Sequence, residues 1–228
     1  MHETSPLLHF AEDRLQIAAL SFMAMVYALK VGWILRFPAA RDRQARTGHG
    51  HTNPRKGALY SLGAIALPWT VLSTRQHPFF WVQFALFHVG VAVSIAMSFG
   101  IPYAPELITS PAAVLGLQLI FAVAFVIGLG RLIRRIVNPY VRAISSPDDY
   151  FCLTLLVVWF GFSFLAAPHD RERSEWPLLG YFFLTAFFLV YVPFSKISHY
   201  LYYPFARWYL GKTLGHRGVY PIERGLGA

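Results

Sequence analysis

Long runs of uncharged apolar residues constrain the fold of this chain more than any other feature. A run of about 20 such residues is long enough to cross a bilayer as a helix. The sequence is 56% hydrophobic and only 14% charged, which is more apolar than an ordinary soluble domain. We therefore predict one all-α membrane domain over 1-228, a five-span transmembrane helical bundle with spans at about 15-36, 79-99, 112-130, 150-167 and 177-199.

A further apolar stretch, residues 58-74, is shorter than the others and contains Pro68. Arg75 and His77 follow it closely, and the next apolar run opens at Phe79, so a spanning helix would have almost no connection in which to turn. Treating the stretch as a span would also invert the charge bias of every later loop. We interpret it as an additional in-plane or re-entrant helix on the cytoplasmic side.

Lysine and arginine are distributed unevenly over the predicted loops. Cytoplasmic loops of membrane proteins carry an excess of these residues. With the amino terminus outside, sixteen Lys and Arg lie inside, three lie outside (Arg14, Arg171 and Arg173), and Lys30 lies within the first helix. The tail, 200-228, is then cytoplasmic, and topology explains the net charge of +9 without nucleic acid. The amino terminus lacks the basic start of a signal peptide, so we expect the first helix to remain uncleaved.

Histidine is the residue that any metal chemistry of this chain must use. Cys152 is the single cysteine, so disulfides and cysteine-ligated zinc or iron–sulfur sites are not available from this chain alone. Nine histidines are present, most of them in tails or loops, where solvation explains them. For His49 and His51 in the sequence GHGH, a solvated loop is a better explanation than a surface metal site.

Two histidines differ from the rest because they lie within or at the edge of an apolar span. His88 is about nine residues into its span, roughly 13 Å along the helix. His199 follows the fifth apolar run, where the run meets its charged edge. An imidazole in such a place requires a partner, either a hydroxyl or carbonyl group or a metal. On the predicted topology, both histidines lie toward the cytoplasmic half of the membrane. Gly90, two residues after His88, would let a flat ring approach the helix closely.

Two neutral imidazoles can bind a haem iron as its two axial ligands. Such an iron is six-coordinate and low-spin, and it is suited to passing single electrons because no position is open for another ligand. The many Phe, Tyr and Trp side chains would pack around the macrocycle. We therefore predict that His88 and His199 are the axial ligands of one haem iron.

Three short motifs carry a resemblance to a known family. They are FHVGV at 87-91, ISSPDDYF at 144-151 and VPFSKISH at 192-199, the last followed by YPFARW. Their order and spacing resemble the membrane cytochrome b family of the respiratory nitrate reductase gamma subunit, closest to its sulfite-reductase-associated, heterodisulfide-reductase-like and hydrogenase-associated branch. The resemblance covers nearly the whole chain, and it implies a bacterial or archaeal cytoplasmic (inner) membrane as the location.

The resemblance implies two haems stacked across the bilayer, each between the second and fifth spans. His88 and His199 match the ligand pair nearer the cytoplasm. The other pair would require histidine ten residues after His88 and eighteen before His199, where this sequence has Ser98 and Tyr181. Neither is an ordinary low-spin ligand, although tyrosinate can ligate high-spin haem. We therefore predict one haem b. His77 is a candidate for an extra ligand, but it lies at the interface beside Pro78, and solvation is its simpler interpretation.

The resemblance also implies a function in a respiratory chain. Electrons would pass between quinone, as the substrate, and a cytoplasmic iron–sulfur or catalytic subunit of heterodisulfide-reductase-like, hydrogenase or molybdoenzyme type. No independent catalytic site is recognised in the chain. Lys196 is a candidate contact for quinone or a haem propionate, and a lysine that snorkels at a helix end is its simpler interpretation.

Two other functions are compatible with a small membrane protein of this composition. In a haem-free membrane anchor or assembly subunit, both histidines would only form hydrogen bonds. A small transporter or channel is disfavoured because the spans contain few charged residues and show no repeat. Visible absorption distinguishes the anchor from the cytochrome.

Overall fold

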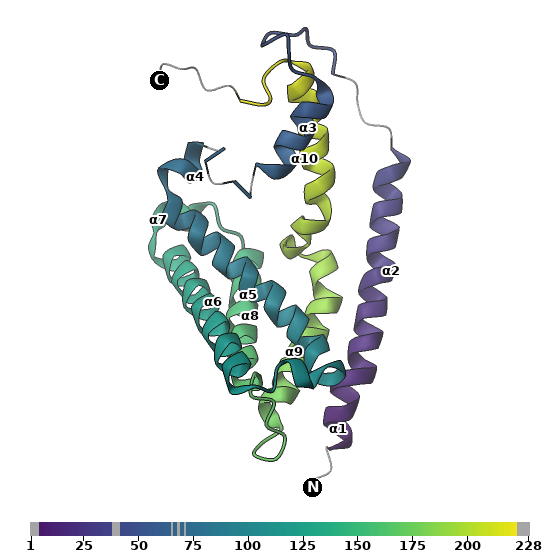
Figure 1. Cartoon of the computed structure of the whole chain (residues 1–228), viewed down its shortest axis with the longest axis vertical. Coiled ribbons are helices and arrows are strands. Elements are labelled where there is room, and N and C mark those ends of the chain that lie inside the picture. The colour runs from purple at the N-terminus through teal and green to yellow at the C-terminus, as the bar shows by residue number, and fades with distance from the viewer. Residues whose placement is uncertain (1–4, 38–41, 65, 68, 71, 223–228) are drawn as a thin grey trace. The chain divides into compact units, whose positions relative to one another are not determined.

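The computed structural model describes residues 5-37, 42-64, 66-67, 69-70 and 72-222. Over these residues the chain is helical and has no strand, which confirms the predicted all-α class. Five of its helices are long and apolar enough to cross a membrane, as predicted (Figure 1). Their bounds are Pro6–Arg36, Pro78–Tyr103, Pro111–Val137, Pro147–Ala166 and Trp176–Phe194.

The first of these spans consists of α1 (Pro6–His9), a π-helical turn (Phe10–Arg14) and α2 (Leu15–Arg36). The other four are built on single α-helices. These are α5 (Pro78–Tyr103), α6 (Pro111–Val137), α8 (Pro147–Ala166) and α9 (Trp176–Tyr191). A short helix, α7 (Pro139–Ala143), connects α6 to α8.

Proline and small polar residues mark where the helices begin. Proline is tolerated in the first turn because its missing N–H would have no partner inside the helix. At α6, the Ser110 hydroxyl before Pro111 accepts a hydrogen bond from the Ala113 N–H at 3.2 Å. At α8, the Asp149 carboxylate accepts a hydrogen bond from the Ser146 N–H at 2.7 Å. Polar groups therefore satisfy helix-start N–H donors that would otherwise have no partner.

The predicted fifth span, 177-199, is wrong in its last part. The helix α9 ends at Tyr191 and is followed by two 3₁₀ turns, Val192–Phe194 and Lys196–Ser198. Pro193 lies in the first of these turns, and a proline lacks the N–H that a continuing α-helix requires. His199 is the first residue of a new helix, α10 (His199–His216), which makes up most of the predicted tail 200-228. Residues 223-228 of that tail lie outside the described part of the chain.

The single helix predicted over 58-74 is also wrong. The structure has two short helices instead, α3 (Pro54–Gly63) and α4 (Leu72–Gln76). Asn53 begins α3 by accepting a hydrogen bond from the Lys56 N–H at 2.9 Å. Pro68, on which the prediction partly depended, lies outside the described residues.

The chain forms two compact units. Unit 1 contains residues 1-28 and 83-197, and unit 2 contains residues 29-82 and 198-228. The borders fall inside α2, inside α5 and inside the 3₁₀ turn Lys196–Ser198 that precedes α10. His88 therefore belongs to unit 1, and His199 belongs to unit 2.

Unit 1 is packed around aromatic side chains from α6, α8 and α9. Phe121, Phe160, Tyr181 and Phe182 are all fully buried. The helix α8 lies beside both α6 and α9 (Figure 1). At Gly90 of α5, an added Cβ would lie 2.4 Å from the Ala124 Cβ of α6, so these two helices touch at a position where only glycine fits.

Unit 2 is organised by α3 and α10, which pack side by side and antiparallel (Figure 1). Three glycines make the contact, because a Cβ on Gly57 would lie 2.3 Å from the Gly211 carbonyl oxygen and 2.6 Å from the Gly215 Cα. Near the other end of the contact, the Arg207 Nε donates a hydrogen bond to the Ser61 carbonyl at 3.1 Å. The two helices thus approach backbone to backbone.

An ion pair closes unit 2 at the end of α10. The Arg217 guanidinium donates hydrogen bonds to the two Asp42 carboxylate oxygens at 2.7 and 3.1 Å. Two further hydrogen bonds join the same segments, from the Thr47 and Gly48 N–H groups to the Arg217 carbonyl at 3.2 and 2.9 Å. The hydrogen bond from Arg217 and a second one from the Gln44 N–H lower the pKa of Asp42 from 3.8 to about 2.

The low pKa of Asp42 predicts that acid weakens the Asp42–Arg217 ion pair of unit 2. A depressed carboxyl pKa stabilises the fold above the unfolded-state pKa and loses that contribution as the pH falls through the folded-state value. We expect the Thr47 and Gly48 amides to lose protection from hydrogen exchange between about pH 4 and pH 2, relative to their intrinsic rates. The Asp42→Asn variant should show no such transition, and an identical transition in that variant would contradict the assignment.

Candidate functional site

His88 lies on an exposed face of α5 within unit 1. Its Nδ1 is 2.7 Å from the Phe84 carbonyl oxygen, one turn earlier in the helix, and its ring centroid is 4.1 Å from that of Phe84. A carbonyl only accepts hydrogen bonds, so Nδ1 carries the proton, and the lone pair of the neutral imidazole is on Nε2. This arrangement is typical of metal-binding histidines, in which a carbonyl orients the ring and fixes its tautomer.

Gly90 does not have the role that the sequence suggested. It was expected to let a flat ring approach the helix beside His88. The structure instead packs Gly90 against Ala124 of α6, with the ring of Phe160 next to it. Residues two apart in a helix point to nearly opposite faces, so His88 and Gly90 lie on different faces of α5.

His199 is the first residue of α10 and is exposed. Its ring lies 6.5 Å from the Tyr200 ring within unit 2. Because each unit is described by itself, the pairing of His199 with His88 stays a prediction.

Tyr181 and Ser98 are brought together in the core of unit 1. The fully buried Tyr181 hydroxyl donates a hydrogen bond to the Ser94 carbonyl of α5, and the Ser98 hydroxyl donates to the Ile95 carbonyl at 2.7 Å. A hydroxyl that donates to a carbonyl is a neutral phenol, whereas a haem ligand would have to be tyrosinate. In this structure Tyr181 therefore links α9 to α5.

Further buried polar groups surround this link. The Trp159 Nε1 donates to the Thr185 hydroxyl at 2.9 Å, and the Ser94 and Ser163 hydroxyls are hydrogen-bonded at 2.6 Å. Inside a bilayer, polar side chains that pair with one another hold neighbouring helices together. These residues join α8 to both α5 and α9, and no motif in the sequence marks them.

Lys196 does not extend away from the protein as a simple snorkelling side chain would. Its Nζ donates hydrogen bonds to the Ser146 hydroxyl at 2.7 Å and to the Asp149 carboxylate at 3.0 Å. The Arg135 guanidinium, at the end of α6, is 3.7 Å from the same carboxylate. The motifs ISSPDDYF and VPFSKISH, which are far apart in the sequence, therefore meet in unit 1.

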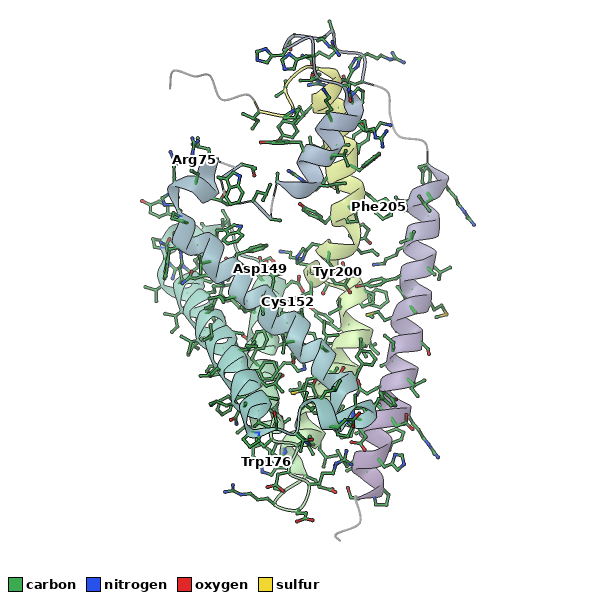
Figure 2. All side chains as sticks on the ribbon, in the orientation of Figure 1. Arg75, Asp149, Cys152, Trp176, Tyr200 and Phe205 are labelled. Atoms are coloured by element: carbon green, nitrogen blue, oxygen red, sulfur yellow. The ribbon has the colours of Figure 1, made fainter. Side chains whose placement is uncertain are left out.

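The neighbouring aspartate makes a second connection between the same segments. The hydroxyl of Tyr191, the last residue of α9, donates a hydrogen bond to the Asp148 carboxylate at 2.7 Å. We refer to Ser146, Asp148, Asp149, Tyr191 and Lys196 together as the aspartate latch. Figure 2 labels Asp149 near the start of α8. The acidic pair and the lysine were visible in the sequence, but their pairing was not.

The other end of unit 1 is held by a different set of polar contacts. The Arg171 guanidinium donates to both Glu12 carboxylate oxygens, at 3.1 and 2.9 Å. The Glu175 carboxylate accepts from the Ser5 N–H at 2.8 Å, and hydrogen bonding to Ser5 lowers the pKa of Glu175. Since α8 ends and α9 begins here, this end is opposite the aspartate latch. The amino-terminal segment and the 168-175 loop thus lie at the same end of unit 1.

A cavity of about 370 Å³ lies next to this loop, and its lining includes Gln118, His169, Arg173 and Trp176. Trp176, labelled in Figure 2, begins α9. Within the described residues, no group of three or more His, Cys, Asp and Glu side chains could hold a bare metal ion. A haem iron differs because the porphyrin supplies four of its ligands, so two histidines suffice.

The fold and these contacts define the chain as a multi-pass, all-α membrane protein. It is 32% identical over 181 residues to a protein of Nitratidesulfovibrio vulgaris (strain Hildenborough), covering 75% of this chain and 74% of that protein. The chain belongs to the same family as that protein, whose name, "Protein", specifies no activity. No protein-family model and no solved structure matches the chain.

Proposed function

We propose that this protein is a haem b-containing membrane subunit of a respiratory complex, in which His88 and His199 would hold the haem iron. The observation that carries the proposal is the hydrogen bond between the His88 Nδ1 and the Phe84 carbonyl. It places the lone pair on Nε2, on an apolar helix, and a metal-binding histidine oriented through Nδ1 would coordinate through that nitrogen. The family resemblance carries the choice of His199 as the second ligand.

Haem, when bound, supplies one-electron transfer. The protein would contribute two imidazoles and, around His88, the rings of Phe84 and Phe87, whose centroids lie 4.1 and 6.2 Å from the imidazole. Aromatic rings pack well against a flat macrocycle and keep water away from it. Such surroundings favour electron transfer over the binding of an external ligand.

The resemblance would require the second ligand pair at positions 98 and 181. Ser98 and Tyr181, which occupy these positions, support a single haem. Tyr181 is fully buried and its hydroxyl is used by the Ser94 carbonyl. A ligand role for Tyr181 would break this hydrogen bond and leave a buried carbonyl without it.

The proposed partners are quinone within the bilayer and a cytoplasmic iron–sulfur or catalytic subunit. The proposed location is the inner membrane of a bacterium or archaeon, with the amino terminus outside. The amino-terminal segment and the 168-175 loop lie at one end of unit 1, which supports placing both on the same side of the membrane, and the charge bias of the loops makes that side the outer one. Arg135 and Lys196, at the opposite end of unit 1, would lie on the cytoplasmic side, as the charge bias of the loops requires.

Haem stoichiometry tests the proposal. Protein purified in detergent is expected to show a reducible low-spin b-type spectrum, and the pyridine haemochrome is expected to give about one haem per chain, since one bis-histidine pair holds one iron. The Tyr181→Phe variant should keep this content. Absence of a reducible band would favour the haem-free anchor, whereas two haems per chain, or half the content in Tyr181→Phe, would establish a second site.

A further inference from the structure

The chain between α9 and α10 is not a continuous helix, yet the aspartate latch holds it at two points. Tyr191 is tied to Asp148, and Lys196, five residues later, is tied to Asp149 and Ser146. Between them the chain passes through the Val192–Phe194 turn. A short segment fixed at both ends has few conformations left, so the path of the chain as far as Lys196 is set by α8.

The aspartates are themselves held in place. Asp149 accepts hydrogen bonds from the Ser146 N–H and hydroxyl at 2.7 and 2.9 Å, and its side chain is only 19% exposed. Arg135 adds a second cation 3.7 Å away. The Lys196 side chain is itself 57% exposed, but it binds to a carboxylate that is fixed at the start of α8, so only one of the two partners is mobile.

We propose that the aspartate latch positions His199 for iron binding, an inference that rests on the proposed function. Lys196 precedes His199 by three residues, and the Lys196–Ser198 turn is all that separates them. Lys196 is then a positioning residue that acts through Asp149 and Ser146. Holding an axial ligand in place before the cofactor binds lowers the entropy cost of binding.

Two variants test the latch in the full-length, haem-loaded protein. Lys196→Met removes the ammonium group and keeps a flexible side chain, and Asp149→Asn removes the charge but retains an oxygen that can accept from the Ser146 N–H. Loss of a group that orients a metal ligand typically costs about 10-fold or more in affinity. We expect each variant to hold haem about 10-fold less tightly and to show a high-spin fraction, measured by visible and electron paramagnetic resonance spectroscopy.

Added imidazole distinguishes a misplaced ligand from general damage. It should restore the low-spin spectrum in Lys196→Met and Asp149→Asn, because it can occupy the position that His199 has left. Lys196→Arg, which keeps the charge, should resemble the unmodified protein. Glu12→Gln is the matched control, since it breaks a two-point ion pair at the opposite end of unit 1 and should leave the spectrum unchanged.

The possible results separate the latch from the haem assignment. Low-spin spectra and haem affinity that are unchanged in both Lys196→Met and Asp149→Asn would overturn the latch and leave the proposed function intact. A high-spin fraction that imidazole does not restore, or an equal effect of Glu12→Gln, would also overturn it. Unmodified protein without haem would overturn the proposed function and the latch with it.

Discussion

Replacing His88 with alanine is expected to abolish the low-spin b-type spectrum of the purified protein. A bis-histidine iron that loses one imidazole becomes five-coordinate or leaves the protein, and either change removes the sharp low-spin bands. The fold should survive, because the His88 side chain is exposed and alanine favours the helix. Visible spectra in the oxidised and reduced states, recorded on protein of unchanged elution volume, measure the effect.

His199→Ala is expected to behave in the same way, and His169→Ala provides the matched control. His169 is another histidine of unit 1, but it lies in the loop before α9, at the end opposite the aspartate latch. Its removal should leave the haem content and spectrum unchanged. A low-spin spectrum that persists in either His88→Ala or His199→Ala would show that the ligands are wrongly assigned.

The five spans could be predicted from the sequence because the free energy of burying apolar residues in a bilayer depends mainly on composition and length. The ends of the helices were harder to predict. Apolar residues continue through Val192 and Phe194, so composition alone gave no reason to end the fifth helix at Tyr191. The break follows from backbone geometry near Pro193, and proline within a membrane helix does not always cause one.

In the stretch 58-74, too, composition did not predict where the helices end. Its apolar composition suggested one helix, whereas α3 ends at Gly63 and α4 begins at Leu72. The packing partner of α3 is α10, which lies about 150 residues later in the sequence and contributes Gly211 and Gly215. Contacts of this kind decide where a marginal helix is stable, and no local pattern contains them.

Some features of the candidate site could be predicted from the sequence, and others could not. His88 could be singled out from the sequence because a histidine within an apolar span is rare and costly. The hydrogen bond between His88 and the Phe84 carbonyl could not be predicted, because a histidine side chain can adopt several orientations on the same helix. The link between Asp149 and Lys196 was missed because it joins the start of one helix to the exit of the next, and no local sequence pattern contains a contact between residues so far apart.

The tight contact between α3 and α10 leads to the second large expected effect. Gly57→Ala adds one methyl group, whose carbon would lie 2.3 Å from the Gly211 carbonyl oxygen and 2.6 Å from the Gly215 Cα. Backbone atoms cannot rotate away as a flexible side chain can, so the helices must separate. Overpacking of this kind typically costs about 1–3 kcal/mol, and a backbone contact should place this variant at the upper end of that range.

Gly63→Ala is the matched control for Gly57→Ala, because it makes the same substitution in the same helix. Nothing lies within 4 Å of the position that its methyl carbon would take. Alanine is a better helix former than glycine by roughly 0.5–1 kcal/mol, so this variant should be neutral or slightly more stable. Hydrogen exchange of the α3 and α10 amides measures both variants, and faster exchange is expected in Gly57→Ala alone. Equal exchange in the two variants would mean that α3 and α10 do not meet at Gly57, because only a contact at that residue makes one methyl group costly and the other harmless.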